Sequence, residues 1–393
     1  MIQYDPLVET RSLYIHWPFC PYKCHFCPFV ALASHDQYME QYHKALVAEI
    51  RQYADSRAQQ SGSKQANPMV IDTIYFGGGT PSTYPDNLLL DMHGILSELF
   101  IIGDSTEMTL EVNPGTVRFE QFGVWKAAGI NRLSIGVQGL NDQVLASLNR
   151  FQKASDVKWL LQEASAYFDN LSIDLILGLP GISAESWKET LYQAVTWPIK
   201  HISMYFLTVH EKTPLYIKVQ SGKIALPDDD EIVDLYYWSR DFLAEHGLFQ
   251  YELSNFARPG YESRHNSAYW NRVPYRGFGI GACSFDGTIR MGNDKNLMRY
   301  LECAITGQSV IDFSETLTPE QVRLERLMLG LRRVSGVTLD GATQGFTDEQ
   351  MGQFEQELSL LKQRGLVVEL DGVLRLTPPG ALLENEVVVK LAQ

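Results

Sequence analysis

Six short apolar segments alternate with amphipathic segments over the first half of the chain, and this alternation restricts the fold more than any other feature. The apolar segments are rich in β-branched or aromatic residues and span residues 12–17, 71–76, 107–113, 132–138, 171–178 and 201–207. The intervening segments have helical periodicity and begin near Ser, Asp or Pro. Because repeated β/α units build parallel sheets, we predict an α/β fold with an incomplete (β/α)6 TIM-like barrel. Functional residues are then expected at the C-terminal ends of the strands.

The alternation ends near residue 207. A long helix is predicted over 228–247, and the stretch 251–292, dense in aromatic residues and glycines, is expected to close over the barrel mouth. Near the C-terminus, two helical stretches precede two strands joined at Asp371-Gly372, a dipeptide typical of hairpin turns. We therefore predict a barrel core over 1–207, a barrel-closing region over 208–314 and an α+β, winged-helix-like domain over 315–393.

Composition restricts the partners that such a chain can have. A net charge of −14 argues against a general nucleic-acid surface, and the predicted C-terminal hairpin also carries little positive charge. No apolar run approaches the roughly 18 residues of a spanning helix, and the N-terminus lacks a basic leader. We expect a cytoplasmic protein with small-molecule or protein partners, no nucleic acid and no transmembrane segment, which leaves room for peripheral membrane contact. The polar stretch 56–68 is predicted to be a surface loop.

Three of the five cysteines, Cys20, Cys24 and Cys27, lie within eight positions directly after the first predicted strand. Three thiolates spaced Cys-x3-Cys-x2-Cys can hold a [4Fe-4S] cluster and leave one iron without a protein ligand. The alternative is structural zinc, with His16 or His25 as the fourth ligand. The cluster is favoured, because zinc ligands more often come as two separated pairs. Cys283 and Cys303 lie outside this spacing and are expected to be buried apolar residues.

A glycine-rich stretch, Gly77 to Gly79 followed by Thr80, comes directly after the second predicted strand. Glycines allow a backbone to approach a ligand closely, although a plain tight turn has the same composition. A phosphate-binding loop would continue with Gly-Lys-Ser or Gly-Lys-Thr, which this stretch lacks. Polar residues also occur at the ends of later strands or in the loops after them, where a barrel would bind a ligand, although each could equally be a cap or an ion-pair partner: Glu111, Gln138, Arg150 and Asp174.

The cysteine spacing, with the aromatic Phe26 before the third cysteine, resembles the hallmark of the radical S-adenosylmethionine (SAM) superfamily. The resemblance implies that the amino and carboxylate groups of SAM chelate the open iron, and that one electron from the cluster cleaves SAM to a 5′-deoxyadenosyl radical. It also implies that Gly77, Gly78, Gly79 and Thr80 hold the methionyl amino group. Within the coproporphyrinogen dehydrogenase (HemN-like) branch, the resemblance implies further SAM contacts from Tyr14, Phe26, Glu111, Gln138, Arg150, Asp174, Thr208 and Phe285.

The sequence "HNSAYW", from His265 to Trp270, resembles a motif of the HemW group of haem chaperones within this branch. The resemblance implies that His265, Tyr269 and Trp270 contact haem, since imidazole is a common axial ligand and aromatic rings pack on porphyrins. From the residues alone, His265 could instead order its loop through hydrogen bonds. One departure is Cys27-Pro28-Phe29, where relatives usually have Cys-Asp-Phe. Pro28 restricts the loop and puts the geometry of SAM beside the cluster in doubt.

These features together lead us to expect a SAM-binding [4Fe-4S] haem chaperone with haem as its cargo, an unknown haem-acceptor protein and an electron donor for the cluster. The alternative is an oxygen-independent coproporphyrinogen III dehydrogenase, or another radical reaction on a tetrapyrrole. The decarboxylating enzymes of the branch carry a further cysteine where this chain has Phe29, and a longer N-terminal segment. We therefore do not expect decarboxylation of coproporphyrinogen III, and no residue is assigned as catalytic. Reductive cleavage of SAM is compatible with this interpretation.

Overall fold

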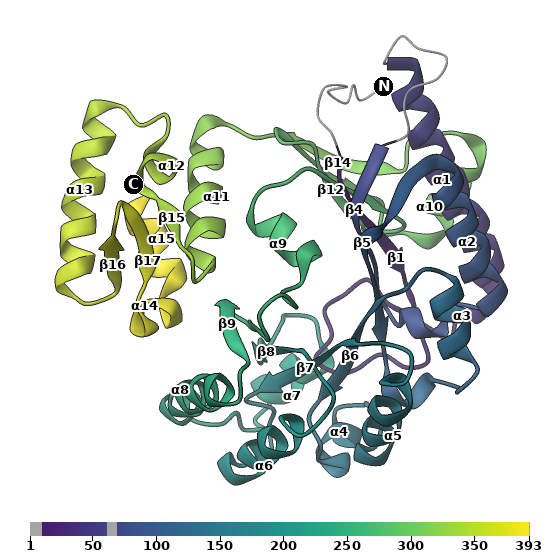
Figure 1. Ribbon diagram of the computed structural model, residues 1–393, viewed down its shortest axis with the longest axis horizontal. Coiled ribbons are helices and arrows are strands. Elements are labelled where there is room, and N and C mark those ends of the chain that lie inside the picture. The colour runs from purple at the N-terminus through teal and green to yellow at the C-terminus, as the bar shows by residue number, and fades with distance from the viewer. Residues whose placement is uncertain (1–9, 61–68, 393) are drawn as a thin grey trace.

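A parallel sheet forms the centre of the molecule (Figure 1). The computed structural model describes residues 10–60 and 69–392. Within them, twelve strands pair into one sheet in the order β14-β13-β12-β11-β1-β4-β5-β6-β7-β8-β10-β9. The strands from β11 to β8 in this order are parallel to one another. This sheet curls without closing, because β14 and β9 end it and do not pair with each other in the described residues.

The six predicted β/α units are present, so the predicted incomplete barrel is confirmed. Its strands are β1 (Ser12–Trp17), β4 (Met69–Gly78), β5 (Phe100–Val112), β6 (Arg132–Gln138), β7 (Asn170–Leu177) and β8 (His201–Phe206). The helices that cover its outer face are α1 (Met39–Gln60), α2 (Asp86–Leu99), α3 (Gln121–Ala127), α4 (Asp142–Ser147), α5 (Ala154–Ala164) and α6 (Ala184–Ala194). One prediction here is partly wrong: residues 56–60 of the predicted loop continue α1, and 61–68 lie outside the described residues.

The core lies between this sheet and its outer helices. Leu13 and Ile15 of β1 are fully buried, and Leu89 and Met92 of α2 pack in the same cluster. Strands covered on both faces have nearly continuous apolar runs, which explains why their positions are readable from the sequence. The helices begin at polar caps; the hydroxyl of Ser183, for example, accepts a hydrogen bond from the first turn of α6.

Residues 251–292, together with β14 beyond them, extend both edges of the sheet, and they place a short helix inside its curve (Figure 1). Their closing over the barrel mouth stays a prediction. At the β1 edge lie β11 (Tyr275–Phe278), β12 (Cys283–Phe285), β13 (Ile289–Asn293) and β14 (Ile311–Thr316). At the β8 edge lie β10 (Asn255–Ala257) and β9 (Phe249–Glu252). The short helix is α9 (Arg264–Trp270), where the His265 ring stacks on Tyr75 of β4 with 5.0 Å between centroids. Aromatic stacking to an inward-facing strand residue therefore holds α9 against the concave face.

The C-terminal part builds a second core. It contains α11 (Pro319–Arg332), β15 (Val337–Thr338), α12 (Leu339–Thr343), α13 (Asp348–Gln363), β16 (Val367–Leu370), β17 (Val373–Leu376), α14 (Pro378–Leu382) and α15 (Glu384–Leu391). Leu327, Phe354 and Leu374 are buried in this core. The predicted hairpin is confirmed between β16 and β17, where Asp371 (φ 54°) and Gly372 (φ 72°) both have the positive φ of a type I′ turn.

The described residues also contain a two-stranded sheet of β2 (Phe19–Cys20) and β3 (Leu32–Ala33), three short 3-10 helices at Asp36–Tyr38, Pro81–Thr83 and Pro114–Thr116, and three further α-helices. These α-helices are α7 (Pro214–Gln220), α8 (Asp229–Glu245) and α10 (Leu297–Thr306), and α8 confirms the long helix predicted over 228–247. In the part of the chain that the structure describes, no helix is long and apolar enough to cross a membrane.

Gly380 provides a test of the C-terminal core. A Cβ at this position would overlap the carbonyl oxygen of Leu366, whereas a Cβ at Gly352 on α13 meets no described atom within 4 Å. We expect Gly380→Ala to lower the free energy of unfolding by about 1–3 kcal/mol through overpacking. Gly352→Ala is the control and should raise it by up to about 1 kcal/mol, because alanine favours a helix interior. Urea and thermal unfolding followed by circular dichroism measure both; equal effects would contradict the packing at Gly380.

Candidate functional site

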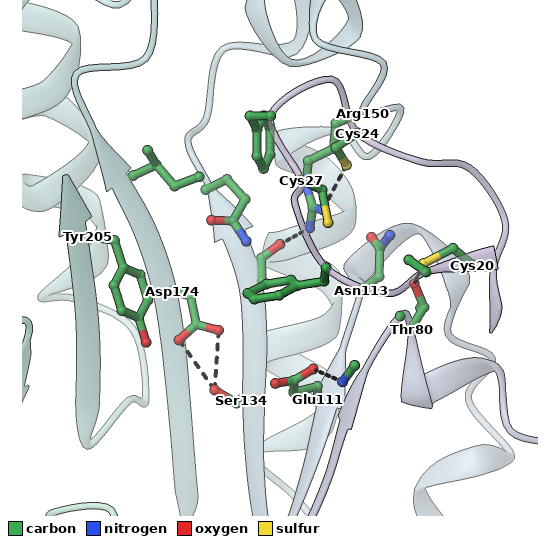
Figure 2. Close-up of a pocket in the computed structure, with 18 of the residues that line it drawn as sticks. Cys20, Cys24, Cys27, Thr80, Glu111, Asn113, Ser134, Arg150, Asp174 and Tyr205 are labelled. Atoms are coloured by element: carbon green, nitrogen blue, oxygen red, sulfur yellow. Dashed lines mark hydrogen bonds between the residues drawn. The ribbon is translucent and has the colours of Figure 1, made fainter. Parts of the chain in front are cut away.

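A cavity of about 460 Å³ opens at the C-terminal ends of the barrel strands (Figure 2). Its wall comprises the loop after β1, the loop after β4 and the ends of β5, β6, β7 and β8. This is the edge of a β/α barrel at which function was expected from the sequence.

Cys20, Cys24 and Cys27 all line this first cavity. Cys20 and Cys24 are buried, and Cys27 is partly exposed. The Cys20 thiol lies 3.1 Å from the Thr80 hydroxyl, and a guanidinium nitrogen of Arg150 lies 3.7 Å from the Cys24 sulfur. Figure 2 shows Cys24 and Cys27 side by side near Arg150, with Cys20 across the cavity beside Thr80. Within the described residues, no three His, Cys, Asp or Glu side chains converge on a single ion position.

The two histidines considered as zinc ligands are engaged elsewhere. Nδ1 of His16 lies 3.0 Å from the Tyr14 hydroxyl, and Nε2 lies 2.8 Å from the carbonyl oxygen of Val30. His25 has its Nδ1 3.2 Å from the Lys218 ammonium. Neither histidine is among the residues lining the first cavity. Three thiols around one cavity, with both of these histidines engaged elsewhere, fit a [4Fe-4S] cluster better than a Cys3His zinc site completed by His16 or His25.

Burial raises the pKa of the Cys20 thiol to about 11, although the hydrogen bond with Thr80 opposes this shift. Burial also raises the pKa of Cys27. Both thiols are therefore protonated at neutral pH when no metal is bound. Metal binding at this loop would have to displace these protons, which couples it to pH.

The glycine-rich loop is packed directly against the cysteine loop. The amide of Gly79 donates to the carbonyl oxygen of Trp17 (2.7 Å), and that of Thr80 donates to the carbonyl oxygen of Phe19 (2.9 Å). A Cβ at Gly78, which has φ 117°, would lie 2.6 Å from the His16 ring. These amides are already used, so a ligand contact from this loop would come from carbonyl oxygens, which suit an ammonium group.

A partly buried carboxylate lies beneath this loop. Glu111 accepts hydrogen bonds from the Tyr75 hydroxyl (2.9 Å) and from the Gly78 amide (3.0 Å). Burial, with a smaller contribution from the charge of Asp174, raises the pKa of Glu111 to about 7. Burial also raises the pKa of Asp174, which accepts from the Ser134 hydroxyl. The floor of the cavity is thus polar and can change charge near neutral pH.

Comparison with known proteins identifies the chain's relatives. Residues 14–193 match the family model of the radical SAM superfamily, and residues 317–383 match that of the HemN C-terminal domain. A protein of Bacillus subtilis named heme chaperone HemW is 33% identical over 380 residues, which cover 96% of this chain and 98% of that protein. The chain belongs to the HemW family. A mitochondrial protein of Mus musculus named radical S-adenosyl methionine domain-containing protein 1 is 37% identical over 70% of this chain and 60% of that protein.

A solved structure related to the HemW family supports the same fold. The coproporphyrinogen III oxidase HemN from Escherichia coli matches with a TM-score of 0.83 and 25% identity, over 99% of this chain and 91% of that one. The predicted radical SAM barrel with a HemN C-terminal domain is therefore confirmed. Membership of the radical SAM superfamily implies a [4Fe-4S] cluster and SAM as cofactors.

Most of the residues predicted to bind cofactors in this HemW-family chain line the first cavity. They are Cys20, Cys24, Phe26, Cys27, Gly78, Gly79, Thr80, Glu111, Gln138, Arg150, Asp174 and Thr208. Gly77 lies just behind it, where a Cβ would be 2.8 Å from the Tyr14 ring. Convergence on one cavity is compatible with the predicted roles, which stay predictions for each residue.

The remaining predicted residues lie elsewhere. Tyr14, Tyr269, Trp270 and Phe285 line a second cavity of about 620 Å³, which shares Pro28, Phe29, Gly78 and Glu111 with the first. Phe285 and Tyr14, predicted as SAM contacts, thus face the neighbouring cavity. The structure separates two adjoining spaces that the sequence motifs did not distinguish.

His265 is buried and lines neither cavity. Its Nδ1 lies 2.8 Å from the Thr73 hydroxyl, its Nε2 lies 2.8 Å from the Tyr269 hydroxyl, and its amide donates to Glu107. Burial lowers the pKa of the imidazole to about 3. Both ring nitrogens are engaged in this conformation. This agrees with the alternative in which His265 orders its loop through hydrogen bonds. Its predicted role as a haem ligand stays a prediction and requires the contact of the ligating ring nitrogen to break.

Sequence reasoning missed several residues of the first cavity and was wrong about one cysteine. Asn113, Ser134 and Ser203 line the cavity. Asn113 directly follows the end of β5, so the signal used for Glu111 could have found it, whereas Ser134 and Ser203 lie inside β6 and β8, where that signal does not apply. Cys283 was expected to be buried; it is exposed and lines the second cavity, because β12 belongs to the added edge of the sheet. Cys303 is partly buried.

The cysteine assignment predicts a selective loss of iron. We expect serine at position 20, 24 or 27 to abolish the bound iron, the sulfide and the brown colour after anaerobic reconstitution, because each removes one of three thiolates around the first cavity. Cys283→Ser and Cys303→Ser are the matched controls and should retain all three. Iron and sulfide assays measure the result. Zinc at full stoichiometry without iron or sulfide would contradict the assignment.

Glu111 predicts a pH-dependent stability of the cluster-free protein. Because the folded-state pKa of about 7 exceeds the ordinary 4.5, the fold favours the protonated acid. This contribution is complete below pH 4.5 and is lost as pH rises to about 7, by roughly 3 kcal/mol in total. The stability of Glu111→Gln relative to wild type should therefore increase over this range and then level off.

Urea unfolding between pH 4 and 8 measures this difference. Glu98→Gln is the control, because the hydrogen bond from Arg51 lowers the pKa of Glu98, so this carboxylate stays charged over most of the range and the difference from wild type should be nearly flat. A flat difference between Glu111→Gln and wild type would refute the raised pKa.

Proposed function

We propose that this chain is a SAM-binding [4Fe-4S] haem chaperone, which binds haem as cargo and passes it to an acceptor protein. The observation that carries the proposal is the match along 96% of the chain to a relative named heme chaperone HemW. HemW relatives from Lactococcus lactis and Mycobacterium tuberculosis also match over almost the whole chain. The aromatic second cavity beside the predicted cofactor cavity supports it further.

We assign three irons of the cluster to Cys20, Cys24 and Cys27, with the fourth left for SAM. We assign the SAM contacts to the predicted residues around the first cavity. The bound cluster would supply the electron that cleaves SAM reductively. The chain's own residues would bind and orient SAM: carbonyl oxygens of the glycine-rich loop toward its amino group, and Glu111, Asp174 and Arg150 toward its other polar groups.

For the cargo, we propose that Tyr269 and Trp270 pack against the porphyrin. Both line the second cavity, whereas His265 supports Tyr269 from behind through its Nε2 hydrogen bond. An electron donor for the cluster and a haem-acceptor protein complete the set of partners. A cluster of reduced thiols suits the reducing cytoplasm, where we place the protein.

The predicted division into 1–207, 208–314 and 315–393 is retained as a proposal about roles. The first region would hold the cofactors, the second would add the wall of the second cavity, and the third would cover that wall with α11. Two separate buried cores, one in the barrel and one in the C-terminal part, support this division. Nothing in the charge of the chain, −14, favours a nucleic-acid partner.

The alternative function is oxygen-independent oxidation of coproporphyrinogen III. The similarity to the E. coli enzyme over 99% of this chain favours it. Phe29 opposes it, because this residue stands where the decarboxylases carry a further cysteine, and its side chain is exposed at the rim of both cavities.

Anaerobically reconstituted protein tests the choice between chaperone and enzyme. We expect haem to bind with a defined absorption spectrum, and we expect no carbon dioxide when the reduced protein is supplied with SAM and coproporphyrinogen III. Haem titrations and gas analysis measure these outcomes, with HemN as the positive control for decarboxylation. Efficient carbon dioxide release, or no haem binding, would favour the alternative.

His265→Ala separates the cargo from the cluster. We expect the variant to change or lose the haem spectrum while iron and sulfide stay at wild-type levels, since His265 is far along the chain from the cysteine loop. Loss of the imidazole removes either a ligand of the haem iron or the hydrogen bond that supports Tyr269. An unaltered haem spectrum would show that neither role holds.

A further inference from the structure

The second cavity concentrates positive charge in an acidic protein. Arg272, Arg290 and Lys295 line it, although the chain as a whole has a net charge of −14. Its wall comes from β1, α9, β11, β12 and β13, and α11 of the C-terminal part contributes Glu325 and Leu329. Its volume of about 620 Å³ lies within the roughly 300–1,000 Å³ typical of small-molecule sites.

One carboxylate is shared by two of these cations. Nε of Arg272 lies 3.0 Å from Glu325 Oε2, and Arg290 contacts Glu325 Oε1. The Glu325 side chain is only 8% exposed, so the local charge is not dispersed by solvent. Nη2 of Arg272 is buried and has no hydrogen-bond partner among the described residues. This end of the cavity therefore has an unused donor, and the three cations outnumber the two carboxylates that line the cavity, Glu325 and Glu111.

Lys295 adds a third cation at an exposed position, and no acidic side chain of the described residues forms an ion pair with it. A cationic ligand would be repelled by these three groups. Carboxylates are the natural partners for them, because guanidinium and ammonium groups form strong charge-assisted hydrogen bonds with carboxylates.

Aromatic rings form the rest of this wall. Tyr14, Tyr269, Trp270, Tyr275 and Phe285 all line the cavity. The guanidinium carbons of Arg272 and Arg290 lie 5.1 Å and 5.9 Å from the Phe285 ring centre, which keeps both cations at the edge of an aromatic surface. Rings beside a cation cluster suit a flat aromatic ligand with carboxylate groups at one side.

We infer that the second cavity is the haem site and that Arg272, Arg290 and Lys295 bind the propionate carboxylates of the haem. This inference rests on the proposed haem-chaperone function and adds to it the location of the cargo and the groups that select it. The porphyrin lies against the aromatic wall, next to the cofactor cavity. When the propionates bind, they replace part of the contact that Glu325 makes with the two arginines.

Haem titrations of the reconstituted protein, followed by absorption, test this inference. Arg290→Met and Lys295→Met should each weaken haem binding about tenfold, since each removes one charge-assisted contact. Arg51→Met is the matched control, because Arg51 is also 40% exposed and paired with one glutamate. Lys223→Met is the control for the exposed lysine. Both controls should bind haem as the wild type does, and iron content confirms that every variant is folded.

Haem dimethyl ester, in which both propionates are masked, is the second probe. It should bind the wild type about as weakly as haem binds the variants, and its affinity should be the same for wild type, Arg290→Met and Lys295→Met. If both variants bind haem like the wild type, or if the ester and haem bind the wild type equally, the inference is overturned while haem binding stands. If the wild type binds no haem, the proposed function fails as well.

Discussion

The hydrogen-bonded contact between the ends of β1 and β4 determines where both cavities lie. The amide of Gly79 reaches the carbonyl oxygen of Trp17, and a Cβ at Gly79 would overlap the carbonyl oxygen of Pro18. Only glycine allows two loops to approach this closely. The contact places the cysteine loop over the strand ends on one side and leaves the Tyr14 face of β1 open to the second cavity. Any residue larger than glycine would separate the loops and displace the thiols from the other polar groups.

The sequence predicted the structure best where a short run of neighbouring residues determines it. Strands buried on both faces, such as Ser12–Trp17 and Arg132–Gln138, match their predicted bounds, because continuous apolar runs bounded by polar residues have few alternatives. Strand-end residues such as Glu111 and Asp174 also lie where predicted, since parallel strands present their C-terminal ends at one edge.

Positions that depend on distant contacts were not predictable in this way. The placement of α9 depends on the packing of His265 against Tyr75 and on its bond to Thr73, which lies 192 positions away. The exposure of Cys283 depends on β12 joining the edge of the sheet beyond β1, which no local pattern reveals. The second cavity, where Tyr14 and Phe285 lie beside Tyr269 and Trp270, likewise arises from the return of the chain to the β1 edge.

An ion pair with a buried carboxylate joins the C-terminal part to the sheet, and this contact bears on the second cavity. Arg332 at the end of α11 contacts Glu252 of β9 at 2.8 Å, and the Glu252 side chain is fully buried. The Arg332 guanidinium also lies over the Trp270 ring, 4.4 Å from its centre. Removing Arg332 would leave the buried Glu252 carboxylate without its cation, which is costly, so this contact helps to hold α11 against β9. Arg332 thus links the α11 wall of the second cavity both to β9 and to Trp270 of the same cavity.

The shared wall of Pro28, Phe29, Gly78 and Glu111 has a thermodynamic consequence. Two ligands that contact the same side chains from opposite sides cannot bind independently, unless their effects on those side chains cancel. If occupancy of one cavity shifts Glu111 or Phe29 and thereby alters affinity in the other by some factor, reciprocity requires the same factor in reverse. Binding of haem would then change the affinity for SAM, and binding of SAM would change the affinity for haem, through a few side-chain atoms and without any movement of the domains.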